Sequence, residues 1–377
     1  MINRFYTGKI EKLLEPNKVL VVYGPRQVGK TTLIKEFLQG YQRKVYSSTG
    51  ENAPLADVFA SRDIAKITAF FSGYDLIVID EAQRIEDIGT GLKIIVDQIP
   101  GIRVIATGSS SFDLSNKIGE PLVGRQRVIT LYPLSIMELT AHFGGAYPVE
   151  HLEHLLVFGS YPESLTAPSL EKKKEILALL RDGYLYRDLL ELENLRNSKK
   201  ILDLLRLIAF QIGKEVSLQE LGVTLGMSRA TVERYLDLLE KAFVLINVRG
   251  FSRNLRKEIT KTSRYYFYDT GIRNAGIDNF NPISLRSNDE RGMLWENFII
   301  VERLKKRSYR KIYANQYFWR TWQQQEIVLG EEREGKLFGY ELKYAKHRSK
   351  IPSQWKEAYP DASFEVISKE NYLPFIA

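Results

Sequence analysis

The sequence predicts an α/β protein whose first part is a parallel sheet built around a phosphate-binding loop. Two adjacent stretches carry this prediction. Val19–Tyr23 is a short apolar run, which is typical of a strand buried in a parallel sheet. It leads directly into Gly24-Pro25-Arg26-Gln27-Val28-Gly29-Lys30-Thr31-Thr32, after which Leu33, Ile34, Phe37 and Leu38 repeat with helical spacing. The order strand, glycine-containing loop and helix is the context that such a loop requires.

The spacing of Gly24, Gly29, Lys30 and Thr31 is that of a P-loop, G-x-x-x-x-G-K-[ST]. Backbone N–H groups of 24–32 are expected to wrap a phosphate chain, so the two glycines must allow unusual dihedral angles and close approach. The N-terminus of the following helix adds a positive dipole end. Lys30 supplies a charge for the β- and γ-phosphates, and the Thr31 hydroxyl can hold Mg²⁺.

A second apolar run, Leu76–Ile79, ends in Asp80 and Glu81, which is the Walker B pattern. We expect Asp80 at the strand end to support the Mg²⁺ that Thr31 holds. Glu81 can orient and deprotonate the attacking water and is the predicted catalytic base.

Two further polar positions are predicted near the γ-phosphate. The strand Arg103–Ala106 ends in a Thr/Gly/Ser run, and in ATPases with a glutamate after the Walker B aspartate, a strand inserted between the two motifs ends in a polar sensor. Thr107 or Ser109 fits that role, with a simple serine-rich turn as the alternative. Arg125, before the predicted strand Val128–Leu131, is a candidate arginine finger acting in cis or from a neighbouring subunit, or a solvated arginine.

These segments together resemble the AAA-type ATPases, often called AAA_14, that carry a C-terminal DUF4143 region. The resemblance rests on GPRQVGKTT, LIVIDEAQ, ATGSSSFDL and PLVGRQRVITLYPLSIMEL, and it continues through FGSYPE, YLYRDLL, YFYDTGIRNA, GMLWENFIIVERL and YFWRTWQQQEI. It covers essentially the whole chain. It implies ATP as the nucleotide, because the residues show no motif for guanine, and a homo-oligomer is a possible form.

Composition sets the wider limits. The 377 residues are enough for two or three domains, and the absence of cysteine excludes a disulfide framework and a Cys-based zinc site. The first residues have no apolar core of a signal peptide, and no run reaches the ~18 apolar residues of a membrane helix. We therefore expect a cytoplasmic protein. The domains are predicted as an AAA-like P-loop ATPase at 1–145, a helical connector at 146–198, a winged helix-turn-helix at 199–280 and an α/β domain at 281–377.

The winged helix-turn-helix prediction rests on three helical patterns, with Ser228 as the N-cap of the third, and on two strands that follow them. Its predicted recognition helix mixes Arg229 and Arg234 with Glu233, Asp237 and Glu240, and acids oppose phosphate. The wing is basic, with Arg253, Arg256, Lys257, Lys261 and Arg264. DNA contact and a protein-interaction role are both consistent with these residues.

The formal net charge of +8 is concentrated near the C-terminus. Residues 301–350 hold 13 Lys/Arg against 6 Asp/Glu, whereas residues 1–150 hold 17 against 16.

The last part of the chain resembles the restriction-endonuclease-like fold of the PD-(D/E)xK group. Glu341 and Lys343 form the Glu-x-Lys motif at a strand end, and Glu296 lies on a preceding helix. The position where that group has its aspartate is Val328, and a valine cannot complete a site of carboxylate oxygens. We expect a degenerate site in which Glu341 and Lys343 form an ion pair.

Three functions are consistent with the sequence. The first is a Mg²⁺-dependent ATPase coupled to a DNA- or protein-interaction module. The second is a nucleotide-gated DNA-binding or regulatory adaptor with little turnover. The third, an ATPase-linked nuclease, is disfavoured by Val328.

Overall fold

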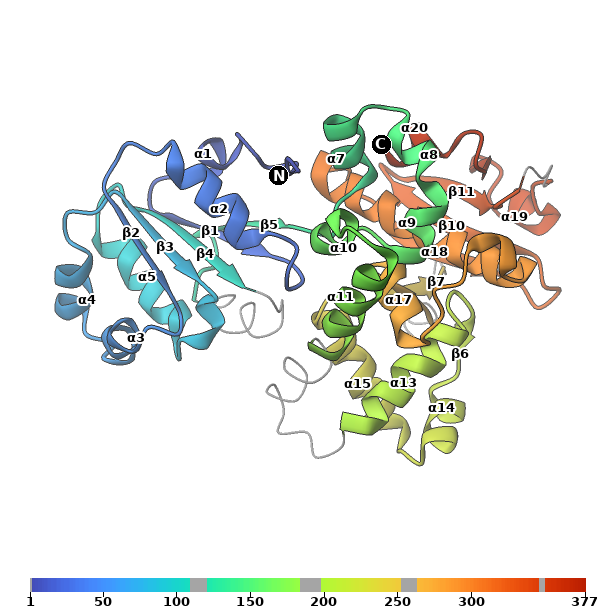
Figure 1. The fold of residues 1–377 in the computed structure, drawn as a ribbon, viewed down its shortest axis with the longest axis horizontal. Coiled ribbons are helices and arrows are strands. Elements are labelled where there is room, and N and C mark those ends of the chain that lie inside the picture. Colours follow the sequence, from blue (N-terminus) through green and yellow to red (C-terminus); the bar gives the residue numbers. More distant parts are fainter. Residues whose placement is uncertain (1, 109–120, 184–197, 252–262, 346–349) are drawn as a thin grey trace. The chain divides into compact units, whose positions relative to one another are not determined.

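The computed structural model describes residues 2–108, 121–183, 198–251, 263–345 and 350–377. The chain divides into two compact units, which are described separately below (Figure 1). The first contains Asn3–Tyr132, and the second contains Pro133–Glu240 and Val244–Ala377.

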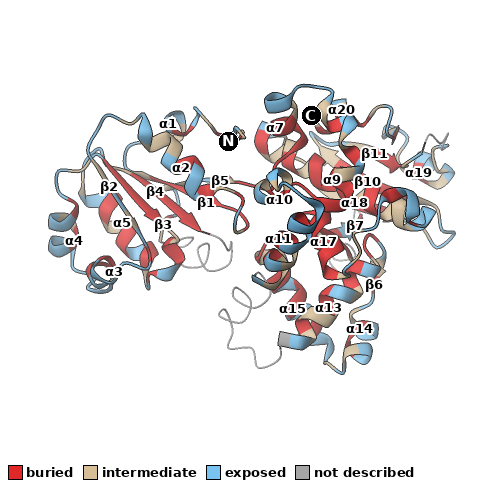
Figure 2. Ribbon diagram, viewed as in Figure 1, coloured by how far each residue is buried: buried red, intermediate tan, exposed pale blue. Residues whose placement is uncertain are grey.

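The first unit is a five-stranded, fully parallel sheet with the order β2-β3-β4-β1-β5. Its strands are β1 (Lys18–Tyr23), β2 (Val45–Thr49), β3 (Leu76–Asp80), β4 (Arg103–Gly108) and β5 (Gln126–Thr130). The apolar runs of β1, β3 and β4 are almost completely buried, as runs covered on both faces of a sheet should be (Figure 2). Strand β4 lies between β1 and β3, which confirms the predicted insertion of a strand between the two nucleotide motifs.

The described helices of this unit are α1 (Ile10–Leu13), α2 (Lys30–Gln39), α3 (Ala53–Ala60), α4 (Ile64–Phe71), η1 (Ala82–Arg84) and α5 (Ile88–Gln98). Asn52 and Asp63 cap α3 and α4 through side-chain oxygens that accept the N–H of Leu55 and Lys66. Gly91 lies where α5 contacts Phe59, since an added Cβ would be 2.0 Å from that ring. Helices α3 and α5 are thus in close contact.

The second unit contains a mixed seven-stranded sheet with the order β12-β11-β10-β9-β7-β8-β6. Its strands are β6 (Glu215–Val216), β7 (Leu245–Gly250), β8 (Ser263–Phe267), β9 (Asn315–Arg320), β10 (Glu326–Arg333), β11 (Lys336–Leu342) and β12 (Ser363–Ile367). The described helices are α7 (Ile136–Phe143), α8 (Tyr147–Glu150), α9 (Leu152–Phe158), α10 (Pro162–Thr166), α11 (Leu170–Gly183), α13 (Ser198–Phe210), α14 (Leu218–Leu225), α15 (Arg229–Lys241), α17 (Thr270–Gly276), η3 (Ile283–Leu285), α18 (Asn288–Arg310), α19 (Ser353–Ala358) and α20 (Tyr372–Ile376).

The sheet of the second unit is continuous across the predicted boundary at 280. Strand β7 pairs with β9 in parallel through Arg249↔Tyr317 and Gly250↔Phe318. Phe251, immediately after β7, donates its N–H to the Phe318 carbonyl at 2.7 Å and packs in one apolar cluster with residues of the C-terminal strands. The hairpin of the predicted winged helix and the predicted C-terminal domain therefore share one sheet and one core.

Helices α13, α14 and α15 follow the predicted helical patterns. Ser228 Oγ accepts the N–H of Thr231 at 3.1 Å, so the predicted N-cap is confirmed. Gly226 ends α14 in the left-handed region, with φ of 59°. The residues expected to face inward are buried, among them Leu204, Ile208, Val232, Leu236 and Leu239. The assignment of this segment as a winged helix remains a prediction.

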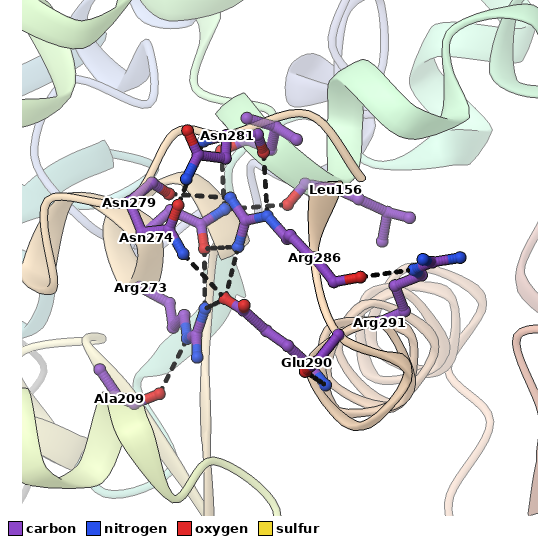
Figure 3. A network of polar contacts seen from close by, with 11 residues as sticks. Leu156, Ala209, Arg273, Asn274, Asn279, Asn281, Arg286, Glu290 and Arg291 are labelled. Carbon is purple, nitrogen blue, oxygen red and sulfur yellow. Dashed lines mark hydrogen bonds and ion pairs between the residues drawn. The ribbon is translucent and has the colours of Figure 1, made fainter. Parts of the chain in front are cut away.

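A buried polar network joins α17 to the start of α18 (Figure 3). The guanidinium groups of Arg273 and Arg286 both donate to Glu290 Oε1, at 2.9 and 2.7 Å. Both also donate to Asn274 Oδ1, and Arg273 Nε reaches the Ala209 carbonyl at 2.8 Å. One carboxylate is therefore shared by two buried guanidinium groups, and the network ties three helices together.

Candidate functional site

The loop after β1 has the backbone shape that its glycines predict. Gly24 has φ of 145°, and a Cβ there would lie 2.0 Å from the Leu131 carbonyl oxygen. Gly29, with φ of 93°, is the N-cap of α2, and Gln27 also has a positive φ of 56°. Loop and helix thus form a compact turn whose backbone lies at the N-terminal end of a helix dipole.

Lys30 is the first residue of α2, and its side chain is buried. Its Nζ donates to the carbonyl oxygens of Gly24 and Pro25, each at 2.8 Å. The ammonium group therefore lies within the loop, where its charge can act on a bound phosphate at short range. Of the other predicted nucleotide-binding positions, Val28 is fully buried, Arg26 is half-buried and Thr32 is exposed.

The structure brings Thr31 and Asp80 together. Thr31 Oγ1 donates to Asp80 Oδ2 at 2.7 Å, and the other carboxylate oxygen, Oδ1, accepts a short hydrogen bond from Thr107 Oγ1. Thr107 is buried at the end of β4. Of the two predicted sensor positions, the structure thus places Thr107 beside the Walker B carboxylate, and Ser109 lies outside the described residues.

Glu81 has a left-handed backbone, with φ of 49° and ψ of 45°. Its N–H lies 3.3 Å from Thr107 Oγ1, and its Oε2 accepts from Gln83 Nε2 at 2.6 Å. Gly50 passes so close that an added Cβ would lie 2.3 Å from the Glu81 carbonyl oxygen. A strained, over-determined turn of this kind is typical of a functional position.

The donors at Thr31 and Asp80 fit a Mg²⁺ ion held with a nucleotide. Both are oxygen ligands, which hard cations prefer, and they come from the two motifs expected to supply them. In the described part of the chain, no group of three or more His, Cys, Asp or Glu side chains could hold a metal ion. Mg²⁺ usually uses one or two protein ligands plus phosphate oxygens and water, so this sparse donor set suits it.

Arg125 lies at the other end of the sheet. Its carbonyl accepts the N–H of Val19 at the start of β1, whereas the phosphate loop follows the end of that strand. Four strand residues between them correspond to roughly 13 Å. Its guanidinium is paired with Asp97 at 2.6 Å. The structure therefore does not bring Arg125 to the phosphate loop of its own chain, and a role toward a neighbouring subunit stays a prediction.

The residues of the predicted nuclease-like motif lie close together in the second unit. Lys343 Nζ is 2.6 Å from Glu341 Oε1, so the expected ion pair is present. Strands β10 and β11 pair from Leu329↔Tyr340 to Arg333↔Lys336, and Val328, the residue before Leu329, is buried. Burial raises the pKa of Glu296 to about 8, and Glu326 and Glu341 add to this effect. At the position where the resemblance expects an aspartate, the chain thus has a buried valine.

The wing prediction requires one correction. Arg264 is buried on β8, where it donates to Glu326 Oε2 at 2.8 Å and lies 4.2 Å from the centre of the Phe318 ring. Because this side chain is buried and paired, it is unavailable to DNA. The other basic residues predicted on the wing, Arg253, Arg256, Lys257 and Lys261, lie outside the described residues.

Arg4 contacts the phosphate loop, and no sequence pattern predicted this contact. Its buried guanidinium donates to the carbonyl oxygens of Val28 and Tyr132. An arginine near an N-terminus carries no local pattern that could have revealed these contacts.

Among the described residues, no helix is long and apolar enough to span a bilayer.

Three known families match successive parts of the chain. Residues 16–140 match the family described as "AAA domain", residues 149–282 match "Domain of unknown function (DUF8612)", and residues 291–373 match "Domain of unknown function (DUF4143)". The first match contains the phosphate loop, Asp80 and Glu81.

Similar proteins extend over most of the chain. "Uncharacterized protein Rv2008c" of Mycobacterium tuberculosis is 30% identical over 353 residues, covering 92% of this chain and 74% of that protein. "Uncharacterized protein MJ1544" of Methanocaldococcus jannaschii is 24% identical over 379 residues, covering 95% and 82%. An "Uncharacterized protein" of Haemophilus influenzae is 23% identical over 298 residues, covering 72% of each chain. Because the chain is 30% identical to the Mycobacterium tuberculosis protein over 92% of its own length, it belongs to the family of AAA-domain proteins that carry a DUF4143 region at the C-terminus.

Proposed function

We propose that the first unit binds ATP with Mg²⁺ and hydrolyses it, and that the second unit uses the nucleotide state to act on a macromolecular partner. The contact between Thr31 Oγ1 and Asp80 Oδ2 carries this proposal. It joins the two motifs that must meet at one phosphate-bound cation: Thr31 lies in the helix that follows β1, Asp80 ends β3, and β4 alone lies between these two strands.

Each side chain has a distinct role in the proposed reaction. Lys30 and the amides of 24–32 hold the β- and γ-phosphates, so that the nucleotide is fixed in place. Thr31 and Asp80 would hold Mg²⁺, which neutralises phosphate charge when bound. Glu81 orients water and accepts its proton, and Thr107 positions Asp80 through their hydrogen bond.

Mutation of Lys30 and Glu81 tests the proposal. Lys30→Ala should weaken nucleotide binding, and Glu81→Gln should bind ATP but turn it over at least a hundredfold more slowly, because general base catalysis contributes about that much. Arg62→Gln, which removes an exposed arginine paired with Asp87, is the control and should match the wild type. Wild-type turnover by Glu81→Gln would rule out Glu81 as the base.

A nucleotide-gated adaptor with little turnover is the second candidate. The observation that favours this candidate is the hydrogen bond from Gln83 Nε2 to Glu81 Oε2. It occupies one carboxylate oxygen of the proposed base, which would otherwise be able to accept a proton from water. Comparing single-turnover with steady-state hydrolysis separates the two. An adaptor would form a long-lived ATP complex and show slow turnover even at saturating Mg²⁺.

The partner of the second unit can be tested by salt dependence. The basic residues of 252–262 and of 301–350 suggest a weak, sequence-independent polyanion surface. Reversal of Arg256 and Lys257 to Glu should weaken binding equally on all DNA sequences and flatten its dependence on salt. If affinity is unchanged, the partner is a protein or the contact lies elsewhere.

The proposed role of Arg125 toward a neighbouring subunit also has a direct test. Arg125→Ala and Lys30→Ala would each be inactive alone, but mixed oligomers would recover part of the ATPase activity if the arginine acts in trans. A strictly monomeric protein with no recovery would exclude the idea.

A further inference from the structure

Arg4 lies in a buried position beside the phosphate loop. Its Nη1 donates to the carbonyl oxygen of Val28, and its Nη2 donates to that of Tyr132 at 2.6 Å. Only 9% of the residue is exposed. The side chain therefore bridges two segments that are more than a hundred positions apart in the sequence, the phosphate loop and the end of the first unit.

The segment around Arg4 is itself held in place. The Arg4 N–H donates to Thr7 Oγ1 at 3.1 Å, and Thr7 Oγ1 lies 3.4 Å from Glu36 Oε2 on α2. The backbone that carries the Arg4 side chain is thus held by its own turn, and that turn is linked through Thr7 to the helix that begins at the phosphate loop.

The contact with Val28 controls the direction of the next amide. A trans peptide is planar, with its C=O and N–H pointing in opposite directions. Fixing the Val28 carbonyl on Arg4 therefore directs the Gly29 N–H away from Arg4. Gly29 has the freedom to rotate, with φ of 93°, and its Cβ position lies 3.7 Å from Arg4 Nη1. In a P-loop the backbone amides hold the phosphates, so the orientation of this peptide affects anion binding directly.

The contact with Tyr132 links the loop to the end of the first unit. Tyr132 ends the segment Asn3–Tyr132 of that unit, and the preceding Leu131 donates its N–H to the Tyr23 carbonyl at 2.8 Å, just before the loop begins. Pro133 follows, and Leu134 donates to the Ser160 carbonyl at 2.9 Å inside the second unit. Ile136 then donates to Glu302 Oε2 at 2.7 Å.

We propose that Arg4 is a positioning residue that holds the Val28–Gly29 peptide in its phosphate-binding orientation and transmits nucleotide occupancy to the chain that leaves the first unit at Tyr132. This inference rests on the proposed nucleotide binding. An arginine is suited to the task because its fork of donors serves two carbonyl oxygens at once, whereas a lysine offers a single point of attachment.

The first experiment measures ADP and ATP affinity by titration calorimetry for wild type, Arg4→Ala and Arg4→Lys. Loss of a charge-assisted hydrogen bond corresponds to about a tenfold loss of affinity. We expect at least this for Arg4→Ala, with Arg4→Lys between it and the wild type. Arg127→Gln is the matched control, because it removes a charge from β5 at its bond with Glu15 and should bind nucleotide normally.

Chemical rescue separates positioning from a purely structural role. Millimolar methylguanidinium should restore nucleotide affinity to Arg4→Ala, and methylammonium should not, because only the former supplies two donors in the correct plane. Equal rescue by both ions would overturn the proposal, as would wild-type affinity in Arg4→Ala. If Arg4→Ala is unfolded in a thermal melt, Arg4→Lys carries the test by its affinity alone. Failure of the wild type to bind nucleotide would instead refute the proposed function.

The second experiment follows hydrogen exchange in peptides covering 131–137. In the wild type, saturating ATP with Mg²⁺ should change exchange at the amides of Leu134 and Ile136. In Arg4→Lys at saturating nucleotide, this response should be reduced while the phosphate loop itself remains protected. An undiminished response in the variant, or none in the wild type, would overturn the transmission.

Discussion

The side-chain oxygens of Thr31 and Asp80 lie 2.7 Å apart, although 49 positions separate the two residues in the sequence. The contact forms because β1 and β3 flank the inserted β4 in a parallel sheet, so their carboxyl ends lie at the same edge. Thr107, at the end of β4, completes the arrangement from between them.

Asp80→Asn should separate nucleotide binding from Mg²⁺ dependence. The amide keeps its shape but loses the charge that favours a hard cation. We expect ATP affinity measured in EDTA to change little, while the gain in affinity on adding Mg²⁺ falls about tenfold. Asp97→Asn, on α5, is the control. An unchanged Mg²⁺ response in Asp80→Asn would place the cation elsewhere.

Gly24→Ala should abolish nucleotide binding. The new Cβ would lie 2.0 Å from the Leu131 carbonyl oxygen, and φ of 145° is strained for alanine. The loop must move or the sheet edge must open, at a cost of about 2 kcal/mol or more. Gly40→Ala, whose Cβ would meet only the Phe37 carbonyl at 3.9 Å, should be neutral. Denaturant unfolding and nucleotide titration measure both effects.

Glu290→Gln should destabilise the second unit. Glu290 accepts from the buried guanidinium groups of both Arg273 and Arg286, and its loss removes the counter-charge that the two share. Breaking a buried pair of this type costs about 3 kcal/mol. Asp289→Asn, which removes an exposed charge one residue earlier, is the control. Equal midpoints of unfolding for the two variants would contradict the expectation.

Glu296 should make stability depend on pH. Burial raises its pKa from 4.5 to about 8, so the folded state binds this proton more tightly than the unfolded chain. Its stabilising contribution is therefore complete below about pH 4.5 and is lost as pH rises through about 8, with a change on the order of 5 kcal/mol. Glu296→Gln should flatten this part of the pH–stability profile and raise the melting temperature at pH 8. The exposed Glu357→Gln is the control, and a profile unaltered by Glu296→Gln would refute the assignment.

The second unit should cut no DNA. Val328 is buried at the position where the PD-(D/E)xK group, which this segment resembles, has an aspartate, and an apolar side chain cannot hold Mg²⁺. Incubation with linear and supercoiled DNA in Mg²⁺ and in Mn²⁺ tests this. Cleavage that Lys343→Ala abolishes would reverse the conclusion. If there is none, gain of cleavage in Val328→Asp would show that one lost ligand silenced the site.

Much of the candidate site could be predicted from the sequence because its residues are encoded locally. The phosphate loop needs two glycines, a lysine and a threonine at set positions between a strand and a helix, and Asp80 must end a buried strand. The pairing of Glu341 with Lys343 was also predictable, since side chains two apart lie on the same face of a strand.

Tertiary structure alone decided the environments of three arginine side chains, because local sequence patterns do not specify them. Arg4, Arg125 and Arg264 are similar in the sequence, each an arginine near an element boundary. The fold places Arg4 against the phosphate loop, Arg125 in an ion pair at the opposite end of the sheet, and Arg264 in a buried position on β8, paired with Glu326. A long, charged side chain adopts whichever of these environments its distant neighbours create, because desolvation and pairing depend on groups brought together only by folding. The pairing of β7 with β9 likewise depends on tertiary structure. Strand pairing depends on the packing of the whole core, and no residue of either strand specifies its partner alone.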